Sequence, residues 1–419
     1  MERTLEHALQ LDTEDSLKSY RNQFHLPLRT NGEPYIYLCG NSLGLQPKKT
    51  AEYVQQELKD WKNLGVEGHF HAQNPWLPYH EFLTEKMAKI VGAKPLEVVV
   101  MNTLSVNLHL LMATFYRPTK DRFKILIESD AFPSDRYAVE SQLKFHGYVD
   151  GLLELKPRDG EVLLREEDIE ATIEKEGGSI ALILIGCPNY YTGQVFDMKK
   201  LAALGHAKGC TVGFDLAHGA GNLPLELHDS NIDFAAWCTY KYLNSGPGSV
   251  GGCFIHERHA HAFELPRFAG WWGHNKETRF GMRDDFDPIP GAEGWQLSNP
   301  PILSLAAIRA SLDVFDEVGM PALVEKSRKL TGYMERLLED LSDGLRIITP
   351  RDSKKRGCQL SLQITKGSGK EIFKSITDRG VIADWREPDV IRIAPAPLYN
   401  NYSDVFKFVT ILKEAINGL

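Results

Sequence analysis

The stretch DFAAWCTYKYLN, residues 233–244, joins a run of apolar residues to a single lysine, Lys241. Lysine is seldom fully buried without a partner, because removing its charge from water is costly unless its pKa falls. Lys241 therefore either extends its amine from a strand end into water or supplies a neutral nucleophile. The stretch alone leaves both interpretations open.

Apolar runs on the N-terminal side of Lys241 predict a sheet that is covered on both faces. Four runs are almost continuously apolar, at 123–129 (FKILIES), 180–186 (IALILIG), 210–215 (CTVGFD) and 233–239 (DFAAWCT). Helical patterns alternate with them, at 103–115, 165–177 and 198–209. This alternation predicts a mostly parallel sheet with right-handed crossovers, whose ligands bind beyond the carboxyl ends of the strands.

The C-terminal third of the chain has a different pattern. Residues 265–298 form a Gly-, Trp- and Pro-rich segment without periodicity, which we expect to be functional. A helical region at 303–341 and the strand-like CQLSLQIT and VIRIAPAPLYN follow it. The fold class is α/β, with a large domain of mostly parallel sheet and helices on both faces, plus a smaller α+β C-terminal domain. We expect an N-terminal segment (1–40) that packs with the small domain, the large domain at 41–300 and the small domain at 301–419.

Composition limits the classes of partner. A net charge of −8 without a basic run argues against nucleic acid. The longest apolar stretches, such as IALILIGC, fall far below the roughly 18 residues of a membrane span, and the acidic N-terminus lacks an apolar signal core. Six cysteines show neither CxxC pairs nor a regular framework. We expect a cytoplasmic protein that does not act on membranes.

Polar residues at neighbouring strand ends indicate pyridoxal-phosphate chemistry. Asp215 ends one apolar run, His218 lies three residues on, and Lys241 follows the next run. A lysine can form a Schiff base with the cofactor, while an acid keeps a proton on its pyridine nitrogen. A phosphate would meet the backbone N–H groups of Leu104 and Ser105 and the Ser105 hydroxyl at a helix N-terminus.

Other interpretations of these residues stay open at this point. Asp215 could cap a helix after its strand, and Ser105 could be an ordinary residue of a first helical turn. His256, His259 and His261 could form a metal cluster, but their spacing favours an exposed helix, and we predict no metal. A cofactor-free binding or scaffold protein on the same fold is the non-catalytic alternative.

Several motifs resemble those of one enzyme family. FPSDRYAVESQL, YYTGQ, GFDLAHGAGN, CTYKYLNSGPG, GWWGH and SNPPIL occur in the order typical of kynureninases, and the resemblance extends from LCGNSLGLQP to IRIAPAPLYN. Kynureninases are pyridoxal-phosphate enzymes of the aspartate aminotransferase fold, fold type I. The resemblance implies that Lys241 is the Schiff-base lysine.

The resemblance also implies roles for the other site residues. Lys241, Asp215 and Tyr240 would be catalytic. The cofactor-binding set would be Leu104, Ser105, Phe132, Pro133, Ser134, Asp135, Asp215, His218, Tyr240, Lys241, Trp271 and Asn299. The substrate-binding set would be His69, Ser298, Asn299 and Arg392, with Arg392 on the α-carboxylate. Trp271 would come from the second subunit of a homodimer with active sites at the subunit interface.

The activity implied is hydrolysis of a carbon–carbon bond in a ketonic substrate. L-Kynurenine or 3-hydroxy-L-kynurenine would give L-alanine and anthranilate or 3-hydroxyanthranilate, in tryptophan catabolism or NAD synthesis. The polar side chains of His69, Ser298 and Asn299 favour the hydroxylated substrate. Gly186 departs from the pattern, because relatives often carry a hydroxyl residue there. A class V aminotransferase or a cysteine desulfurase is the alternative, although Cys358 fits a mobile catalytic cysteine poorly.

Overall fold

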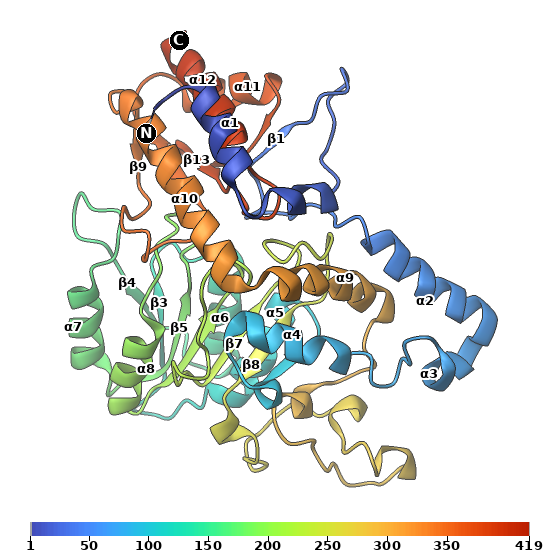
Figure 1. The fold of residues 1–419 in the computed structure, drawn as a ribbon. Coiled ribbons are helices and arrows are strands. Elements are labelled where there is room, and N and C mark those ends of the chain that lie inside the picture. Colours follow the sequence, from blue (N-terminus) through green and yellow to red (C-terminus); the bar gives the residue numbers. More distant parts are fainter. Residues whose placement is uncertain (1, 419) are drawn as a thin grey trace.

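A computed structural model describes residues 2–418 and contains one large mixed sheet (Figure 1). The sheet has seven strands in the order β2-β8-β7-β6-β5-β3-β4. Their bounds are Val98–Val100 (β2), Gly252–Ile255 (β8), Phe234–Trp237 (β7), Thr211–Asp215 (β6), Ile180–Gly186 (β5), Lys124–Glu128 (β3) and Leu152–Leu155 (β4). Strand β8 is antiparallel to both of its neighbours, and the remaining pairs are parallel.

Helices cover both faces of this sheet, as the continuous apolar runs predicted. Along β5, Ile183 and Ile185 belong to one core and Leu182 and Leu184 to another, because successive side chains point to opposite faces. The first core also includes residues of α4 (Glu81–Val91), α7 (Glu166–Glu176) and α8 (Met198–Ala207). The second includes α5 (Leu104–Phe115) and α6 (Pro133–Phe145).

The C-terminal part forms a smaller α+β unit with its own core. Its antiparallel sheet has the order β12-β13-β10-β9, and the strand bounds are Asp384–Arg386, Val390–Ile393, Leu360–Ile364 and Leu345–Ile347. Helices α10 (Met320–Leu338), α11 (Gly369–Asp378) and α12 (Tyr402–Asn417) pack on it. The N-terminal α1 (Leu5–Glu14) lies beside α12, and β1 (Ile36–Tyr37) pairs with β11 (Val381–Ile382) (Figure 1).

Helix α9 (Ile302–Val318) packs into the large core against α2 (Thr50–Leu64) and α4, although the expected division placed it in the small domain. The division at 1–40, 41–300 and 301–419 stays a prediction. In Figure 1, α2 and α3 (Gly68–His71) project to one side of the molecule, and residues 265–298 form irregular loops below the sheet. No helix in residues 2–418 combines the length and the apolarity needed to cross a bilayer.

Short 3-10 helices connect the main elements. They are η1 (Lys18–Gln23), η2 (Gly65–Glu67), η3 (Pro95–Glu97), η4 (Glu257–His259), η5 (Trp271–Gly273), η6 (Arg279–Gly281), η7 (Ala292–Trp295) and η8 (Glu339–Leu341). Three of them, η5 to η7, lie in the Gly-, Trp- and Pro-rich segment. The segment is therefore built of single turns, as its lack of periodicity predicted.

Removal of a buried ring from the large sheet tests this core. Phe234 of β7 is fully buried and stacks on Phe115 of α5, with ring centroids 5.1 Å apart. Phe234→Ala should lower the free energy of unfolding by about 3–5 kcal/mol, because burial is lost and a cavity is left. Urea denaturation followed by circular dichroism measures this loss. Phe145→Ala is the matched control, since Phe145 is 82% exposed, and an equal loss in both variants would contradict the assignment.

Candidate active site

The carboxyl ends of adjacent strands meet at one pocket. Strand β6 ends at Asp215 and its neighbour β7 ends at Trp237, four residues before Lys241. Asp215 and Lys241 line this pocket together with residues from both parts of the chain. The other lining residues are Asn41, Ser42, Thr103, Leu104, Ser105, Glu128, Phe132, Ser134, Asp135, Gly186, Pro188, Tyr190, Ala217, His218, Tyr240, Arg386 and Arg392. The strand-end rule thus located the pocket correctly.

The Lys241 amine is held inside this pocket rather than extended into bulk water. Its Nζ lies 3.0 Å from Nε2 of the buried His218. Burial, and then the charge of Lys241, lowers the pKa of His218 well below its usual value. A neutral imidazole can accept a hydrogen bond from Nζ, so His218 orients the amine. The centroids of the Phe132 and Tyr240 rings lie 5.9 and 6.0 Å from Nζ.

Two acids share the floor of the pocket. Asp215 is buried, and its Oδ1 accepts a hydrogen bond from the Ala217 N–H at 2.6 Å. A series of turns follows it instead of a helix, so the helix-cap interpretation is wrong. Burial, and then the charge of Asp215, raises the pKa of Asp135 well above its usual value. Asp135 therefore keeps its proton more readily than a free aspartate does, and Asp215, at the end of β6, is the candidate partner for a cation.

An anion-binding cradle lies where two helices begin. Helix α5 starts at Leu104 and helix α6 at Pro133, and the hydroxyls of Ser105 and Ser134 lie 2.8 Å apart between them. Thr103 precedes α5 without capping it, so its hydroxyl is not used by the helix. Unpaired N–H groups and the helix dipole make such N-termini favourable for phosphate.

Arg392 of β13 closes the pocket from the small domain. Its guanidinium donates to the Tyr190 carbonyl oxygen at 2.7 Å and to the Asp384 carboxylate, while its buried Nε has no partner within residues 2–418. Burial lowers the pKa of Arg392 to about 10, so the group stays cationic at neutral pH. An unused N–H on a buried cation suits a carboxylate ligand.

Some expected site residues lie outside the pocket. Trp271 is 44% exposed, and its Nε1 donates to the Arg279 carbonyl. Ser298 and Asn299 are exposed, and His69 of α3 packs edge-on against Trp76. Pro133 begins α6 without lining the pocket. Within one chain, the structure therefore does not bring these residues to Lys241.

Several pocket residues were missed by the sequence analysis. Glu128 ends an apolar run as Asp215 does, so the same criterion could have found it. Arg386 lies six residues before Arg392, and Tyr190 belongs to the quoted YYTGQ motif. Asn41 and Ser42 belong to the quoted LCGNSLGLQP, but this stretch reaches the pocket only in the folded chain.

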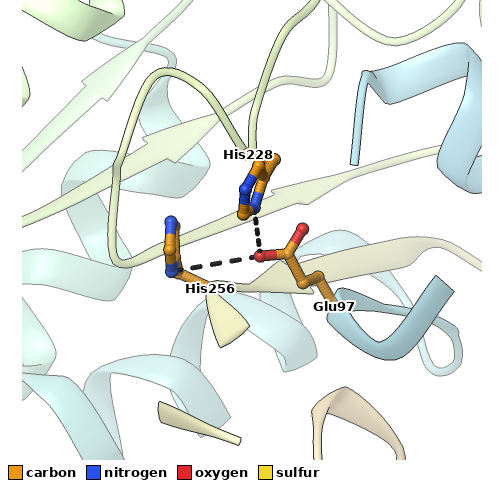
Figure 2. A group of neighbouring side chains, drawn as sticks. All are labelled: Glu97, His228 and His256. Atoms are coloured by element: carbon orange, nitrogen blue, oxygen red, sulfur yellow. Dashed lines mark hydrogen bonds and ion pairs between the residues drawn. The ribbon is translucent and has the colours of Figure 1, made fainter. Parts of the chain in front are cut away.

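A second cluster of titratable side chains lies outside the pocket (Figure 2). Glu97 accepts hydrogen bonds from His228 Nδ1 at 2.9 Å and from the backbone N–H groups of Glu257 and Lys94, each at 2.8 Å. His256 Nδ1 accepts from the Arg258 N–H at 3.1 Å. The Glu97 oxygens and His256 Nδ1 therefore already accept hydrogen bonds from N–H groups. The cluster links η3 to η4, and we assign no metal to it.

The segment around His256 also corrects an expectation. An exposed helix was predicted for HERHAHAF, but only Glu257–His259 form a single 3-10 turn. His256 is buried, and His259 Nε2 lies 2.9 Å from Asp233 Oδ1. Partners from distant segments fix these histidines, which spacing along the chain could not reveal.

The pocket residues fit pyridoxal phosphate. Lys241 offers an amine, Asp215 an acid for the ring nitrogen, and Phe132 an aromatic face. The Ser105 and Ser134 hydroxyls and two helix N-termini offer a phosphate site. Each function that the cofactor requires has a side chain of suitable chemistry in one pocket.

Comparisons with known proteins decide the family. A model of the kynureninase C-terminal domain matches residues 323–412. A kynureninase of Myxococcus xanthus is 61% identical over 97% of this chain and 96% of its own length. A kynureninase of Koribacter versatilis is 56% identical over 96% and 95%. The chain belongs to the kynureninase family. The resemblance drawn from FPSD, GFDLAH and YKYLN is thereby confirmed.

Solved structures confirm the fold type of this kynureninase family member. A cysteine desulfurase from Escherichia coli superposes with a TM-score of 0.77 at 18% identity, over 96% of this chain and 99% of that one. One from Thermococcus onnurineus gives 0.76 at 18% identity, over 92% and 95%. At this identity the likeness shows the fold alone. Cys358 is fully buried, and burial raises the pKa of its thiol to about 12, which disfavours the desulfurase alternative.

Substitution of Asp215 tests its role as a charge partner. Asp215→Ala should remain folded but bind pyridoxal phosphate a hundredfold or more weakly, because losing one partner of a buried charge pair costs about 3–5 kcal/mol. Fluorescence titration with the cofactor measures this loss. Asp197→Ala is the control, since Asp197 caps α8 and is exposed. Cofactor affinity of Asp215→Ala within tenfold of the unmodified chain would contradict the assignment.

Proposed function

We propose that this chain is a pyridoxal-phosphate-dependent kynureninase that cleaves the Cβ–Cγ bond of L-kynurenine or 3-hydroxy-L-kynurenine by hydrolysis. The products are L-alanine and anthranilate or 3-hydroxyanthranilate. The observation that carries the proposal is that Lys241 and Asp215 line one pocket, beyond the ends of adjacent strands, in a chain of this family. Pyridoxal phosphate supplies an electron sink for carbanionic chemistry on the amino-acid side of the substrate.

Residues of the pocket divide the work of binding and proton transfer. Ser105, Ser134 and the N-terminus of α5 would hold the phosphate, and Asp215 would keep the ring nitrogen protonated. Lys241 Nζ removes the proton from the substrate Cα, with His218 orienting the amine at 3.0 Å. Arg392 binds the α-carboxylate through its planar guanidinium.

Tyr240 is the proposed proton donor at the substrate carbonyl. Burial raises the pKa of the Tyr240 phenol, so the group keeps its proton at neutral pH. Water adds to the γ-ketone, and the proton held by Tyr240 compensates the negative charge that develops on the ketone oxygen. Collapse of the hydrated ketone to the carboxylic acid of the anthranilate then breaks the Cβ–Cγ bond, and the electron pair left on Cβ takes up a proton to give L-alanine.

Turnover of both substrates tests the proposal directly. Purified protein with pyridoxal phosphate should release a fluorescent anthranilate from L-kynurenine or from its 3-hydroxy derivative, and comparing kcat/KM ranks the two. Lys241→Ala should reduce turnover by at least a thousandfold, because the proton acceptor at Cα is lost. Tyr116→Phe is the control, since its hydroxyl bonds the Phe123 carbonyl outside the pocket. Release of a keto acid or sulfide without anthranilate would contradict the proposal.

A homodimer with shared active sites completes the proposed function. Trp271, Ser298 and Asn299 lie outside the pocket of their own chain and are exposed. Exposed apolar side chains occur in the same part of the sequence, at Phe268, Phe280, Met282 and Leu303, and Trp61 of α2 lines a pocket with Leu303. Exposed apolar side chains in such numbers are typical of a protein interface. A second copy packed on this face would deliver these residues, together with His69, to the partner's pocket.

Mixing two inactive variants tests the shared site. Lys241→Ala and Trp271→Ala homodimers should each be severely impaired. A statistical mixture formed by unfolding and refolding together should recover about a quarter of the native specific activity. Half of its dimers are mixed, and each mixed dimer has one intact site. Recovery is measured as anthranilate release, with each variant refolded alone as the control. The absence of any recovery would place Trp271 and Lys241 in the same chain's site or in none.

The proposed location is the cytoplasm. The six cysteines form no disulfide in the part of the chain that the structure describes, which agrees with a reducing compartment. The proposed partners are the small-molecule substrate and a second copy of the chain, without nucleic acid or membrane.

A further inference from the structure

Glu128 is a buried acid in the pocket that the proposed mechanism does not use. It ends β3, is 2% exposed and lines the pocket beside Asp215 and Asp135. Both carboxyl oxygens lie 3.1 Å from the backbone nitrogen of Gly186. Its hydrogen bonds come from backbone N–H groups and the Asn189 side chain, and none comes from a Lys, Arg or His side chain among residues 2–418. An ionised buried acid without a cation is costly.

The missing side chain of Gly186 explains how Glu128 fits. A Cβ at position 186 would lie only 2.7 Å from Glu128 Oε1. Any residue other than glycine would therefore displace this carboxyl. The glycine at position 186 and the inward position of Glu128 therefore belong together.

The groups that face Glu128 come from several elements. Asp215 of β6 and Asp135 of α6 are acids, and Cys187 and Tyr190 follow β5. Burial raises the pKa values of Cys187 and Tyr190, so both are neutral near pH 7. Burial, and then the charge of Asp215, raises the pKa of Glu128 to about 7, against the opposing effect of the Gly186 N–H. Lys241 is the nearby cation, and its charge opposes the rise in the pKa of Asp135.

We propose that Glu128 is a positioning residue of the cofactor pocket that releases a proton to solvent when a pyridinium ring binds beside Asp215. This inference rests on the proposed function. A pyridinium brings one positive charge to a group of three buried acids, and a nearby cation favours the ionised form of a carboxyl. The proton leaves the Glu128 carboxyl for water, and no other bond forms or breaks. Cofactor affinity is therefore coupled to pH through Glu128.

Pyridoxamine 5′-phosphate is the probe, because its amine cannot condense with Lys241. Its dissociation constant is measured by fluorescence from pH 5.5 to 8.5, on the full chain freed of cofactor. A cation that lowers the pKa of Glu128 by one unit makes binding tighter by about tenfold at a pH well above 7. The affinity of the unmodified chain relative to Glu128→Gln should rise about threefold between pH 6 and 7, approach about tenfold by pH 8 and then level off.

Glu128→Gln is the decisive variant, since its amide oxygen can still accept the Gly186 N–H. It should nearly match the unmodified chain at pH 5.5 and bind the probe about tenfold more weakly at pH 8 and above. Asp130→Asn is the control, because Asp130 is exposed two residues away and Asn tolerates its positive φ of 54°. Glu128→Asp, which keeps an ionisable group, should retain a rise of affinity with pH.

Three outcomes would overturn the inference. Glu128→Gln could weaken binding by the same factor at every pH, which is the sign of a purely structural role. It could show the same pH dependence as the unmodified chain, or Glu128→Asp could show none. Failure of the unmodified chain to bind the probe at any pH would instead overturn the proposed cofactor, and the inference with it.

Discussion

The parallel pairing of β6 with β5 and β7 is the constraint on which the pocket depends. Asp215 pairs in register with Gly186 on one side and with Ala236 on the other. The acid is thereby fixed between the end of β5 and the strand that leads to Lys241. Because parallel strands end at the same edge, residues far apart in sequence meet there without a dedicated loop. The rest of the site is arranged around this pair.

Charge balance is the second constraint on the pocket. Glu128, Asp135 and Asp215 line one pocket and are all buried. Neighbouring buried carboxyls cannot all ionise without a large cost in free energy. Raised pKa values of Asp135 and Glu128 reduce the negative charge that gathers in the pocket. A cationic ring would relieve the remaining excess of negative charge. The pocket is in this sense built for a ligand that brings a positive charge and an anionic group together.

Much of the fold could be predicted because burial leaves a direct pattern in the sequence. The runs at 123–129, 180–186, 210–215 and 233–239 correspond to β3, β5, β6 and β7, and the helical patterns between them to α5, α7 and α8. Helix α9 was harder to place. Its apolar face does not by itself specify a core, and its contacts with α2 and α4 depend on how the chain returns to the sheet.

The sequence by itself determined the alternation of strands and helices, the family and the chemistry of Lys241 and Asp215, because these follow from residue type and order along the chain. Only the tertiary structure decided that Glu128 lies in the pocket beside Asp135 and Asp215, where it accepts a hydrogen bond from the Gly186 N–H. It also decided that Arg386 and Asn41 line the pocket and that Trp271 and Asn299 do not. It also decided that His256 is buried against Glu97 rather than exposed on a helix. The reason is physical, because such contacts join segments distant in the chain and depend on burial and distance, for which local periodicity carries no signal.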